Sequence, residues 1–126
     1  MNTAVTVLQV ILAFLFTVGG VLKLAVPYAK YSNIPGVSWA KEFKPEHVRL
    51  LGLLELCGGI GLAVPLFLPA LIMLIPLAAV GMALYMSGAM ATHLRRSEYL
   101  FMALNLLFFL APALFVAYGR LVGFAA

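Results

Sequence analysis

Several polar side chains lie within otherwise apolar stretches of the chain, and five of them form one candidate set. They are Lys23, Glu55, Tyr85, His93 and Asn105. Ionisable groups inside a membrane helix are costly and mark functional sites by default. A lone carboxylate there takes up a proton or finds a cationic partner, and Lys23 is the basic residue deep enough to pair with Glu55. Such a set could hold the polar head of a small molecule, with Glu55 or His93 exchanging protons with it.

Metal and thiol chemistry are not expected from this sequence. The two histidines, His47 and His93, are 46 positions apart, and Cys57 is the only cysteine. No zinc or haem ligand set of the usual spacing exists, and neither a disulfide within the chain nor a thiol redox pair can form. We interpret Cys57 as a small buried apolar residue. The prediction is that the chain has no metal site.

The elements that must position these residues are membrane helices. Of the 126 residues, 65% are hydrophobic and 10% are charged, whereas soluble domains carry about 25% charged residues. Four apolar stretches, at about 4–26, 48–67, 70–91 and 99–118, reach the length of about 20 residues that a span needs. No alternation typical of barrel strands is present. We therefore predict an all-α fold, a single domain over 1–126 that forms a four-transmembrane-helix bundle in the lipid bilayer.

The connection between the first two spans is the longest in the chain. Pro27 ends the first helix, since proline lacks an amide donor. Apolar and polar residues then alternate over 37–44, which predicts a short interfacial helix with Trp39 at the membrane surface. The alternative is an irregular loop with an aromatic anchor. Pro76 and Pro112, inside the third and fourth spans, are candidate kinks.

Basic residues are concentrated in the first and third connections. The opposite side of the bundle carries only Arg120 near the C-terminus. The positive-inside rule therefore predicts that both basic loops are cytoplasmic and both termini outside, in what we expect to be a bacterial inner (plasma) membrane. Arg95 and Arg96 are interpreted as orientation markers and contacts for anionic lipids, and the net charge of +4 is not taken as a sign of nucleic-acid binding. The basic residues of the two loops are Lys30, Lys41, Lys44, Arg49, Arg95 and Arg96.

The alternating direction of the four spans brings the five polar residues to one depth. At about 1.5 Å per residue, Glu55, Tyr85 and Asn105 lie roughly 10 Å below the basic face, with Lys23 and His93 just above them. We predict a pocket with the first three as its floor and the other two as its roof. The alternative is a salt-bridged cluster that fixes the register of the helices and binds nothing.

Glycines lie one helical turn from three of these residues and so share a face with them. Small residues mark faces where membrane helices approach closely. The pattern therefore predicts that these side chains point into the bundle. The glycines are Gly19 and Gly20 for Lys23, Gly52, Gly58 and Gly59 for Glu55, and Gly81 and Gly88 for Tyr85.

Several segments together resemble the DoxX-like family over nearly the whole chain. They are LLGLLELCGGIGLAVPL around Glu55, GMALYMSGAMATHLRRSE, the closing VAYGR, and Lys23 after two glycines. The resemblance implies a small four-helix integral membrane protein. It carries over Lys23, Glu55, His93, Arg95 and Arg96 as motif positions, without assigned roles.

The resemblance also implies two kinds of activity. The namesake of the family is linked to a thiosulfate:quinone oxidoreductase, which implies quinone-linked electron transfer. More distant relatives resemble assembly chaperones and cargo receptors that bind other membrane proteins. A shared fold alone transfers neither activity.

We expect this chain to act by binding and not as an enzyme on its own, because it lacks an extra soluble domain, a haem ligand pair and a cysteine pair. The first hypothesis is an accessory subunit of a membrane redox system that holds a polar-headed lipophilic molecule, with a quinone as the one candidate cofactor. The alternative is an assembly chaperone or structural subunit in a larger membrane complex, or a homo-oligomer. Proton or small-solute transport ranks third, since no internal repeat or broken helix is evident.

Overall fold

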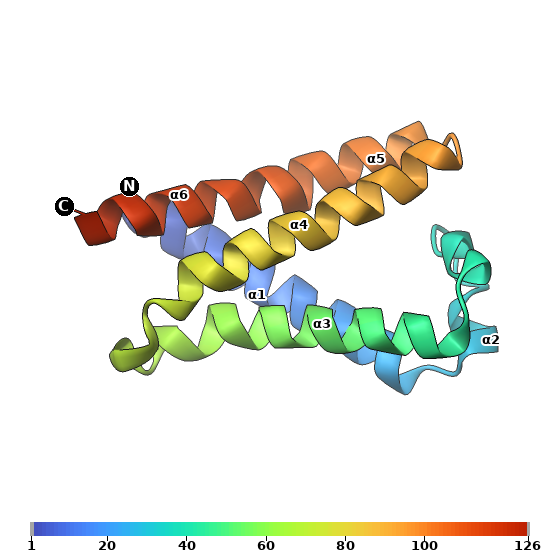
Figure 1. The fold of residues 1–126 in the computed structure, drawn as a ribbon, viewed down its shortest axis with the longest axis horizontal. Helices are drawn as coiled ribbons and strands as arrows, with labels where there is room; N and C mark the ends of the chain where they lie inside the picture. Colours follow the sequence, from blue (N-terminus) through green and yellow to red (C-terminus); the bar gives the residue numbers. More distant parts are fainter. Residues whose placement is uncertain (1, 126) are drawn as a thin grey trace.

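The structure is a computed structural model, and it describes residues 2–125. Three of its membrane-length helices are α1 (Asn2–Ala25), α3 (Pro45–Ala63) and α4 (Leu74–Arg95). The fourth consists of α5 (Tyr99–Asn105), a π-helical turn η4 (Leu106–Leu110) and α6 (Ala111–Ala125). All four segments are long and apolar enough to cross a membrane (Figure 1). The predicted all-α four-helix bundle is therefore confirmed.

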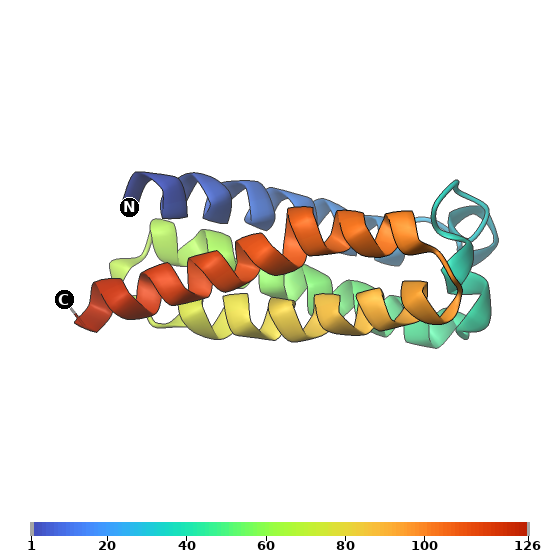
Figure 2. The ribbon, with the colours of Figure 1, turned by 90° about the horizontal axis from the view of Figure 1, so that it is seen from above.

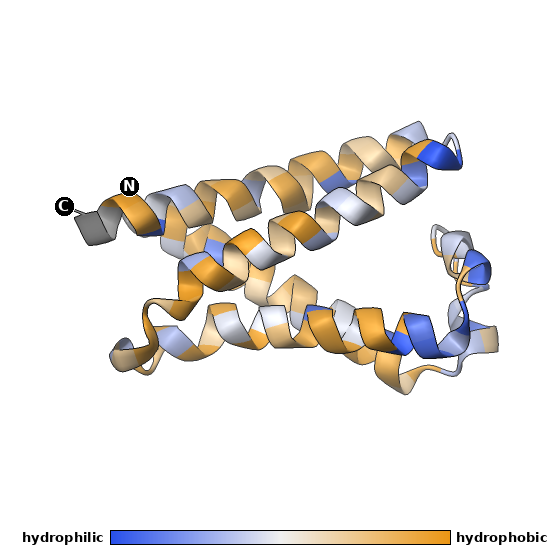
Figure 3. Cartoon of the chain, viewed as in Figure 1, coloured by the Kyte–Doolittle hydropathy of each residue, from blue (hydrophilic) through white to orange (hydrophobic). Residues whose placement is uncertain are grey.

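Four short helical turns occupy the connections. The first connection contains α2 (Tyr28–Tyr31) and η1 (Ser38–Glu42), so the segment predicted as a short helix or an irregular loop is helical over Ser38–Glu42. The second contains η2 (Val64–Leu66) and η3 (Pro69–Leu71). Figure 2 shows both chain termini at one end of the bundle and the first connection, with the α4–α5 turn, at the other. Hydrophilic residues gather at this second end, while the helices between are mainly hydrophobic (Figure 3). We call it the basic end.

Prolines explain where two helix boundaries differ from the prediction. The helix α3 starts at Pro45 and not near residue 48, because proline at the first helical position loses no hydrogen bond. The helix α4 starts at Leu74 and not near residue 70, since Pro69 begins a separate 3₁₀ turn. Pro76 then lies in the first turn of α4, where an amide has no helical partner, so the predicted kink is not required there.

Pro112, the second candidate kink, directly follows the π-helical turn. The amide of Ala111 donates to the carbonyl of Leu106, five residues earlier, and Pro112 has no amide to continue the ladder. A π turn is a common way for a helix to absorb such a break. The fourth span therefore continues past Pro112 instead of ending, and α6 extends beyond the predicted limit of residue 118.

The helices α1 and α3 form a close antiparallel pair that only glycine permits. A Cβ atom on Gly20 would lie 2.6 Å from the backbone nitrogen of Leu56 and 2.7 Å from the carbonyl oxygen of Gly52. One on Gly59 would lie 2.8 Å from the backbone nitrogen of Thr17. The prediction that these glycines mark a close helix approach is correct, because the backbones of α1 and α3 pack directly against each other there.

The same prediction is wrong for the glycines of α4. A Cβ atom on Gly81 or Gly88 would meet nothing within 4 Å. The helix α4 uses a different face for packing, since its buried residues include Ala79, Met82 and Ala83. Spacing along a helix identifies a face but not the neighbour that covers it.

The apolar core lies in the half of the bundle nearer the termini. Its largest fully buried side chains include Phe16, Leu12, Leu62 and Ile75. Cys57 is exposed on the outer face of α3, so its prediction as a buried residue is wrong. Leu53 and Leu54 on α3 are about half exposed as well, at 49% and 48%.

A buried polar cluster closes the core at the end that carries the termini. Gln9 is fully buried, and its Nε2 donates to the carbonyl of Leu62 at 2.7 Å. Its Oε1 accepts a hydrogen bond from Arg120 Nε at 2.9 Å, and Arg120 Nη2 donates to Thr6 Oγ1 at 3.0 Å. These bonds connect α1, α3 and α6, so the bundle is firmly joined at the end opposite the basic loops.

Candidate functional site

A cavity of about 640 Å³ lies at the basic end of the bundle. All five residues of the predicted pocket line it, and they come from α1, α3, α4 and α5. The structure therefore brings together Lys23, Glu55, Tyr85, His93 and Asn105. Much of the remaining wall is aromatic or apolar, and it includes Tyr31, Val37, Trp39, Phe43, Leu51, Leu84, Met86 and Phe109.

Lys23 and Glu55 form an ion pair in the wall of the cavity. Lys23 Nζ lies 2.6 Å from Glu55 Oε2, and the side chains are only 10% and 6% exposed. The hydroxyl of Tyr85 donates to the same oxygen at 3.3 Å. Glu55 Oε1 packs against Gly19, where a Cβ atom would collide with it. Glycine at this position therefore leaves room for the carboxylate between α1 and α3.

Aromatic rings from the first connection surround the Lys23 ammonium. Its Nζ lies 5.8 Å from the ring centroids of both Tyr31 and Trp39, within the range of cation–π attraction. Trp39 also packs edge-to-face on Phe43, with centroids 5.8 Å apart. The hydroxyl of Tyr28 donates to the carbonyls of Ala40 and Phe43 and so holds η1 over the cavity.

The part that these aromatic residues play in the cavity wall does not follow from the sequence patterns. Trp39 was predicted at the membrane surface, and the structure shows in addition that it lies in the cavity wall beside Lys23. Tyr31 and Phe43 were not predicted as site residues. The available signal was the density of aromatic residues in the longest connection, which contains Tyr28, Tyr31, Trp39 and Phe43.

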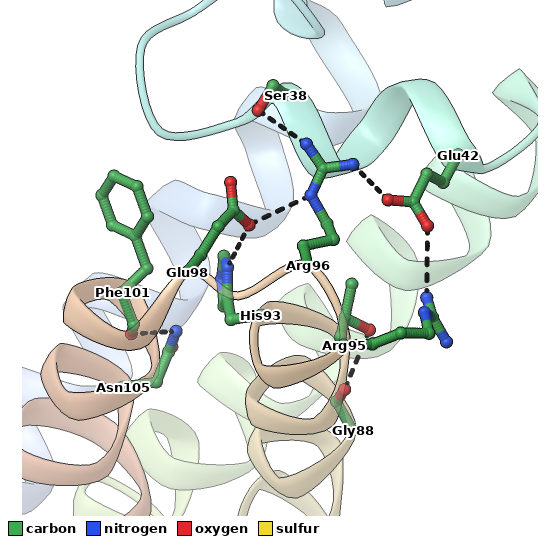
Figure 4. A network of polar contacts seen from close by, with 10 residues as sticks. Ser38, Glu42, Gly88, His93, Arg95, Arg96, Glu98, Phe101 and Asn105 are labelled. Carbon is green, nitrogen blue, oxygen red and sulfur yellow. Dashed lines mark hydrogen bonds and ion pairs between the residues drawn. The ribbon is translucent and has the colours of Figure 1, made fainter.

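His93 is oriented by the way in which α4 ends. Ser97 adopts a positive φ of 59°, the amide of Glu98 donates to the carbonyl of His93 at 2.8 Å, and that of Ser97 donates to Leu94 at 3.0 Å. These two bonds define a Schellman motif, which reverses the chain. This reversal brings the side chain of Glu98 next to His93, so that Glu98 Oε1 lies 3.0 Å from His93 Nδ1 (Figure 4).

The partners of Glu98 determine the tautomer of His93. The pKa of the Glu98 carboxyl lies below its usual value. The main cause is the hydrogen bond between Glu98 and His93, and the hydrogen bond from Arg96 contributes less. An ionised carboxylate can only accept, so Nδ1 of His93 carries the proton. Within residues 2–125 the other ring nitrogen, Nε2, has no hydrogen-bond partner. It is therefore free to accept a hydrogen bond from a molecule in the cavity when the ring is neutral.

Asn105 contributes an acceptor from the fourth span. Its Nδ2 donates to the carbonyl of Phe101 at 3.0 Å, one turn earlier in α5. The π-helical turn begins at the next residue, and it carries Phe109, a further residue of the cavity wall. Because Nδ2 is used within α5, Oδ1 of Asn105 is the amide atom that stays available as a hydrogen-bond acceptor in the cavity wall.

Arg96 connects the first connection to the α4–α5 turn. Its Nη1 pairs with Glu42, its Nη2 donates to Ser38 Oγ at 3.0 Å, and its Nε donates to Glu98 Oε1 at 3.1 Å (Figure 4). We call Ser38, Glu42, Arg96 and Glu98 the Arg96 cluster. The hydrogen bond from Arg96 holds the pKa of Glu42 below its usual value. Arg96 is therefore a structural tie at the cavity end, a role that the sequence analysis did not assign.

Arg95 differs from its neighbour. Its side chain is 64% exposed, and its Nη2 lies 3.4 Å from Glu42 Oε1, a long contact for an ion pair. The structure is thus compatible with lipid contacts at Arg95, whereas the guanidinium of Arg96 is occupied by two carboxylates.

The charges that face the cavity are balanced within the protein. Lys23 is neutralised by Glu55, and His93 is hydrogen-bonded to Glu98. Three groups can still form hydrogen bonds with a ligand. They are the remaining N–H donors of Lys23, Nε2 of His93 and Oδ1 of Asn105. Within residues 2–125 no three His, Cys, Asp or Glu side chains come together in a metal-binding group. The arrangement favours an uncharged polar head group over an ion.

Comparison with known proteins identifies the family of this chain. Neither the curated proteins nor the solved structures contain a match to the chain. The model of the DoxX-like family matches residues 7–116, which include all five predicted pocket residues and the Arg96 cluster. The four membrane-length helices agree with the fold that the resemblance implied. The chain therefore belongs to the DoxX-like family.

Proposed function

We propose that this protein binds a polar-headed lipophilic molecule of the quinone type, as an accessory subunit of a membrane redox system. The observation that carries the proposal is the cavity, in which Lys23, Glu55, Tyr85, His93 and Asn105 meet inside an apolar and aromatic wall. Its volume of about 640 Å³ falls within the range of about 300–1,000 Å³ typical of small-molecule sites. A few convergent polar groups in an apolar enclosure suit an amphiphilic guest.

The residues present are chemically suited to a quinone head group. A quinone, when bound, supplies two carbonyl oxygens that accept hydrogen bonds and the capacity for reduction. Lys23 can donate to one such oxygen while it stays paired with Glu55. The rings of Trp39 and Phe43 offer flat apolar surface to a planar ring. His93, hydrogen-bonded through Nδ1 to Glu98, can hold a proton at Nε2 for exchange with the head group.

Mass spectrometry of small molecules that co-purify with the protein tests this proposal. We expect a defined lipophile at near-stoichiometric amount with the wild-type chain, and its loss from a Glu55→Gln variant. Removing one member of a buried pair can also destabilise the fold. A second variant, Tyr85→Phe, keeps the ion pair and removes one hydrogen bond to it, so we expect partial loss of the lipophile.

Tyr118→Phe is the matched control for these variants. Tyr118 lies on α6, is 65% exposed and does not line the cavity, so this variant should retain the full amount of lipophile. If the wild-type protein carries no lipophile and Glu55→Gln is clearly less stable, Glu55 is a structural tie and the proposal is wrong.

A second candidate function is the binding of another membrane protein, as an assembly chaperone or structural subunit. The open surface of α4 around Gly81 favours it, because a Cβ atom there meets nothing within 4 Å and Leu77 beside it is 69% exposed. Glycine on an open face suits close packing of a partner helix. Recovery of a stable hetero-complex from native membranes, with an empty cavity, would favour this function over the first.

We also propose that the basic end faces the cytoplasm of a bacterial inner membrane and that both termini lie outside. The first connection and the α4–α5 turn share one end of the bundle, and together they carry most of the basic residues. The distribution of Lys and Arg supports this orientation.

A further inference from the structure

The wall of the cavity between α3 and α4 is formed by residues that also lie on the outer surface of the bundle. Leu84 lines the cavity and is 71% exposed. Gly88, one turn further along α4, also lines it, and a Cβ atom there would meet nothing within 4 Å. Leu51 of α3 lines the facing side. The two helices diverge toward the basic end (Figure 1).

Contacts on two sides limit this opening along the helices. Toward the termini, α3 and α4 touch where Gly58 meets Met82, and where a Cβ atom on Gly61 would lie 3.0 Å from Ala78. Toward the basic loops, Glu42 of η1 pairs with Arg96 at the end of α4. The opening is therefore a bounded window, which we call the α3–α4 window and define by Leu51, Leu84 and Gly88.

On the opposite side of the cavity, between α1 and the fourth span, the lining residues Lys23, Asn105 and Phe109 are only partly exposed, unlike Leu84 and Gly88. The rings of Phe16 and Phe109 pack with centroids 5.7 Å apart. Closer to the loops, Gly36 approaches the ring of Phe101, which would lie 3.4 Å from a Cβ atom on that glycine. Access from the side is thus concentrated at the α3–α4 window.

The depth of the window decides what it faces. Gly88 lies seven residues before Arg95, the last residue of α4, and Leu84 lies eleven before it. At about 1.5 Å per residue, these positions are about 10 Å and 16 Å from the helix end. A hydrocarbon core is about 30 Å thick, so the window opens among acyl chains and not into water.

We propose that the ligand enters sideways through the α3–α4 window and remains there in part, with its polar head in the cavity and an apolar tail between Leu51, Leu84 and Gly88. This inference rests on the proposed function and narrows it to membrane-dissolved amphiphiles with a long tail. The direct path from water runs through η1 and the Arg96 cluster, which are held by ion pairs. The proposed ligand is therefore a lipophilic molecule and not a water-soluble one.

The chain offers a matched pair of positions and a built-in reporter for a test. Gly88→Phe places a ring in the window, while Gly81→Phe places the same ring on α4 outside the cavity, and both sites are open to a side chain. Trp39 is the only tryptophan and lines the cavity, so its fluorescence reports a bound quinone. The probes are an isoprenoid-tailed ubiquinone and its tailless head group, titrated into protein held in lipid nanodiscs.

We expect wild-type protein and Gly81→Phe to bind the tailed quinone equally well. Gly88→Phe should weaken binding of the tailed probe by at least about tenfold, since it overpacks the path of the tail. Its affinity for the tailless probe should change by less than about threefold, because the polar groups are untouched. Unchanged binding of the tailed probe by Gly88→Phe overturns the window, as does equal weakening of both probes.

A different result would separate failure of the window from failure of the proposed function. If wild-type protein binds neither probe, the proposed quinone-type function is wrong. The proposal that a quinone tail lies in the α3–α4 window is then overturned as well. A measurement without ligand then tests the window alone: phospholipids brominated along the acyl chain should quench Trp39 in wild-type and Gly81→Phe protein and do so less in Gly88→Phe. Equal quenching in all three proteins overturns lateral access.

Discussion

Gly20 is the residue at which the α1–α3 pair has the least room for change. The atoms that a Cβ would meet are backbone atoms of α3, at 2.6 Å and 2.7 Å, and backbone cannot rotate away as a side chain can. We expect Gly20→Ala to separate the helices and to lower the free energy of unfolding by about 1–3 kcal/mol, the usual cost of overpacking. Thermal unfolding in detergent measures this.

Gly81→Ala is the control for that prediction. The position is helical and open, so the substitution should be neutral or stabilising by up to about 1 kcal/mol, from helix propensity alone. Equal melting temperatures for Gly20→Ala and wild-type protein would mean that α1 and α3 do not pack as closely as described.

At the residue scale, sequence reasoning succeeded where helical spacing alone determines the outcome. Lys23 and Glu55 share faces with glycines, and the structure pairs them across the closest helix contact in the bundle. The same spacing did not predict a close helix contact at Gly88, because this part of α4 borders the cavity and no neighbouring helix packs against it. The prediction that Cys57 is buried was wrong for a related reason. Hydrophobicity does not distinguish a helix face in the core from a face in contact with lipid.

At the scale of elements, the contact between η1 and the α4–α5 turn depends on ionised carboxylates. The pKa values of Glu42 and Glu98 lie below the ordinary value of 4.5 in the folded protein. The unfolded chain therefore binds these protons more readily, so the stabilisation is fully present above pH 4.5 and is lost as pH falls through the lower folded pKa values. We expect the melting temperature to fall over that range.

The Arg96→Gln variant tests the assignment of this pH dependence. It removes the guanidinium that lowers the pKa of Glu42 and contributes to lowering that of Glu98, so the fall in melting temperature with pH should become shallower. Arg95→Gln, which alters only an exposed long contact, should have a smaller effect. Melting curves of the three proteins at a series of pH values would contradict the assignment if their slopes were the same.

Two elements of the site could not be predicted from local sequence. The turn after α4 places a serine, Ser97, in a conformation that normally favours glycine, so no glycine marks the Schellman motif that aims Glu98 at His93. The direction of Trp39 depends on Tyr28, whose hydroxyl holds η1 through the carbonyls of Ala40 and Phe43, 12 and 15 positions away. Neither feature follows from residue type or spacing, and both shape the cavity.

At the scale of the whole molecule, the orientation in the membrane is open to a direct measurement. Lys41 is exposed at the basic end, and Phe67 is 82% exposed at the other. In a Cys57→Ser background, Lys41→Cys should react with a membrane-impermeant maleimide only after the cells are permeabilised. Phe67→Cys should react in intact cells, because its end of the bundle is expected outside. The reverse pattern would invert the proposed topology.

The global fold was the most predictable property, because a bilayer leaves few alternatives to helices that satisfy their own backbone. Four apolar segments gave the bundle, and their alternating direction gave the common depth of Glu55, Tyr85 and Asn105. The sequence did not reveal that α3 and α4 diverge toward the basic end. At the opposite end, the Gln9–Arg120 contact joins residues that are 111 positions apart, which local sequence patterns do not predict.

This divergence at only one end has a consequence for the supply of ligand. Under the proposed function, a cavity confined to the basic end, with a window at that depth, would take up its ligand from just one leaflet of the bilayer. A lipophile with its head in the other leaflet must first flip across before it can be captured. The protein would thus respond to the composition of a single monolayer, and transbilayer movement of the guest would set the upper limit on how quickly the site refills.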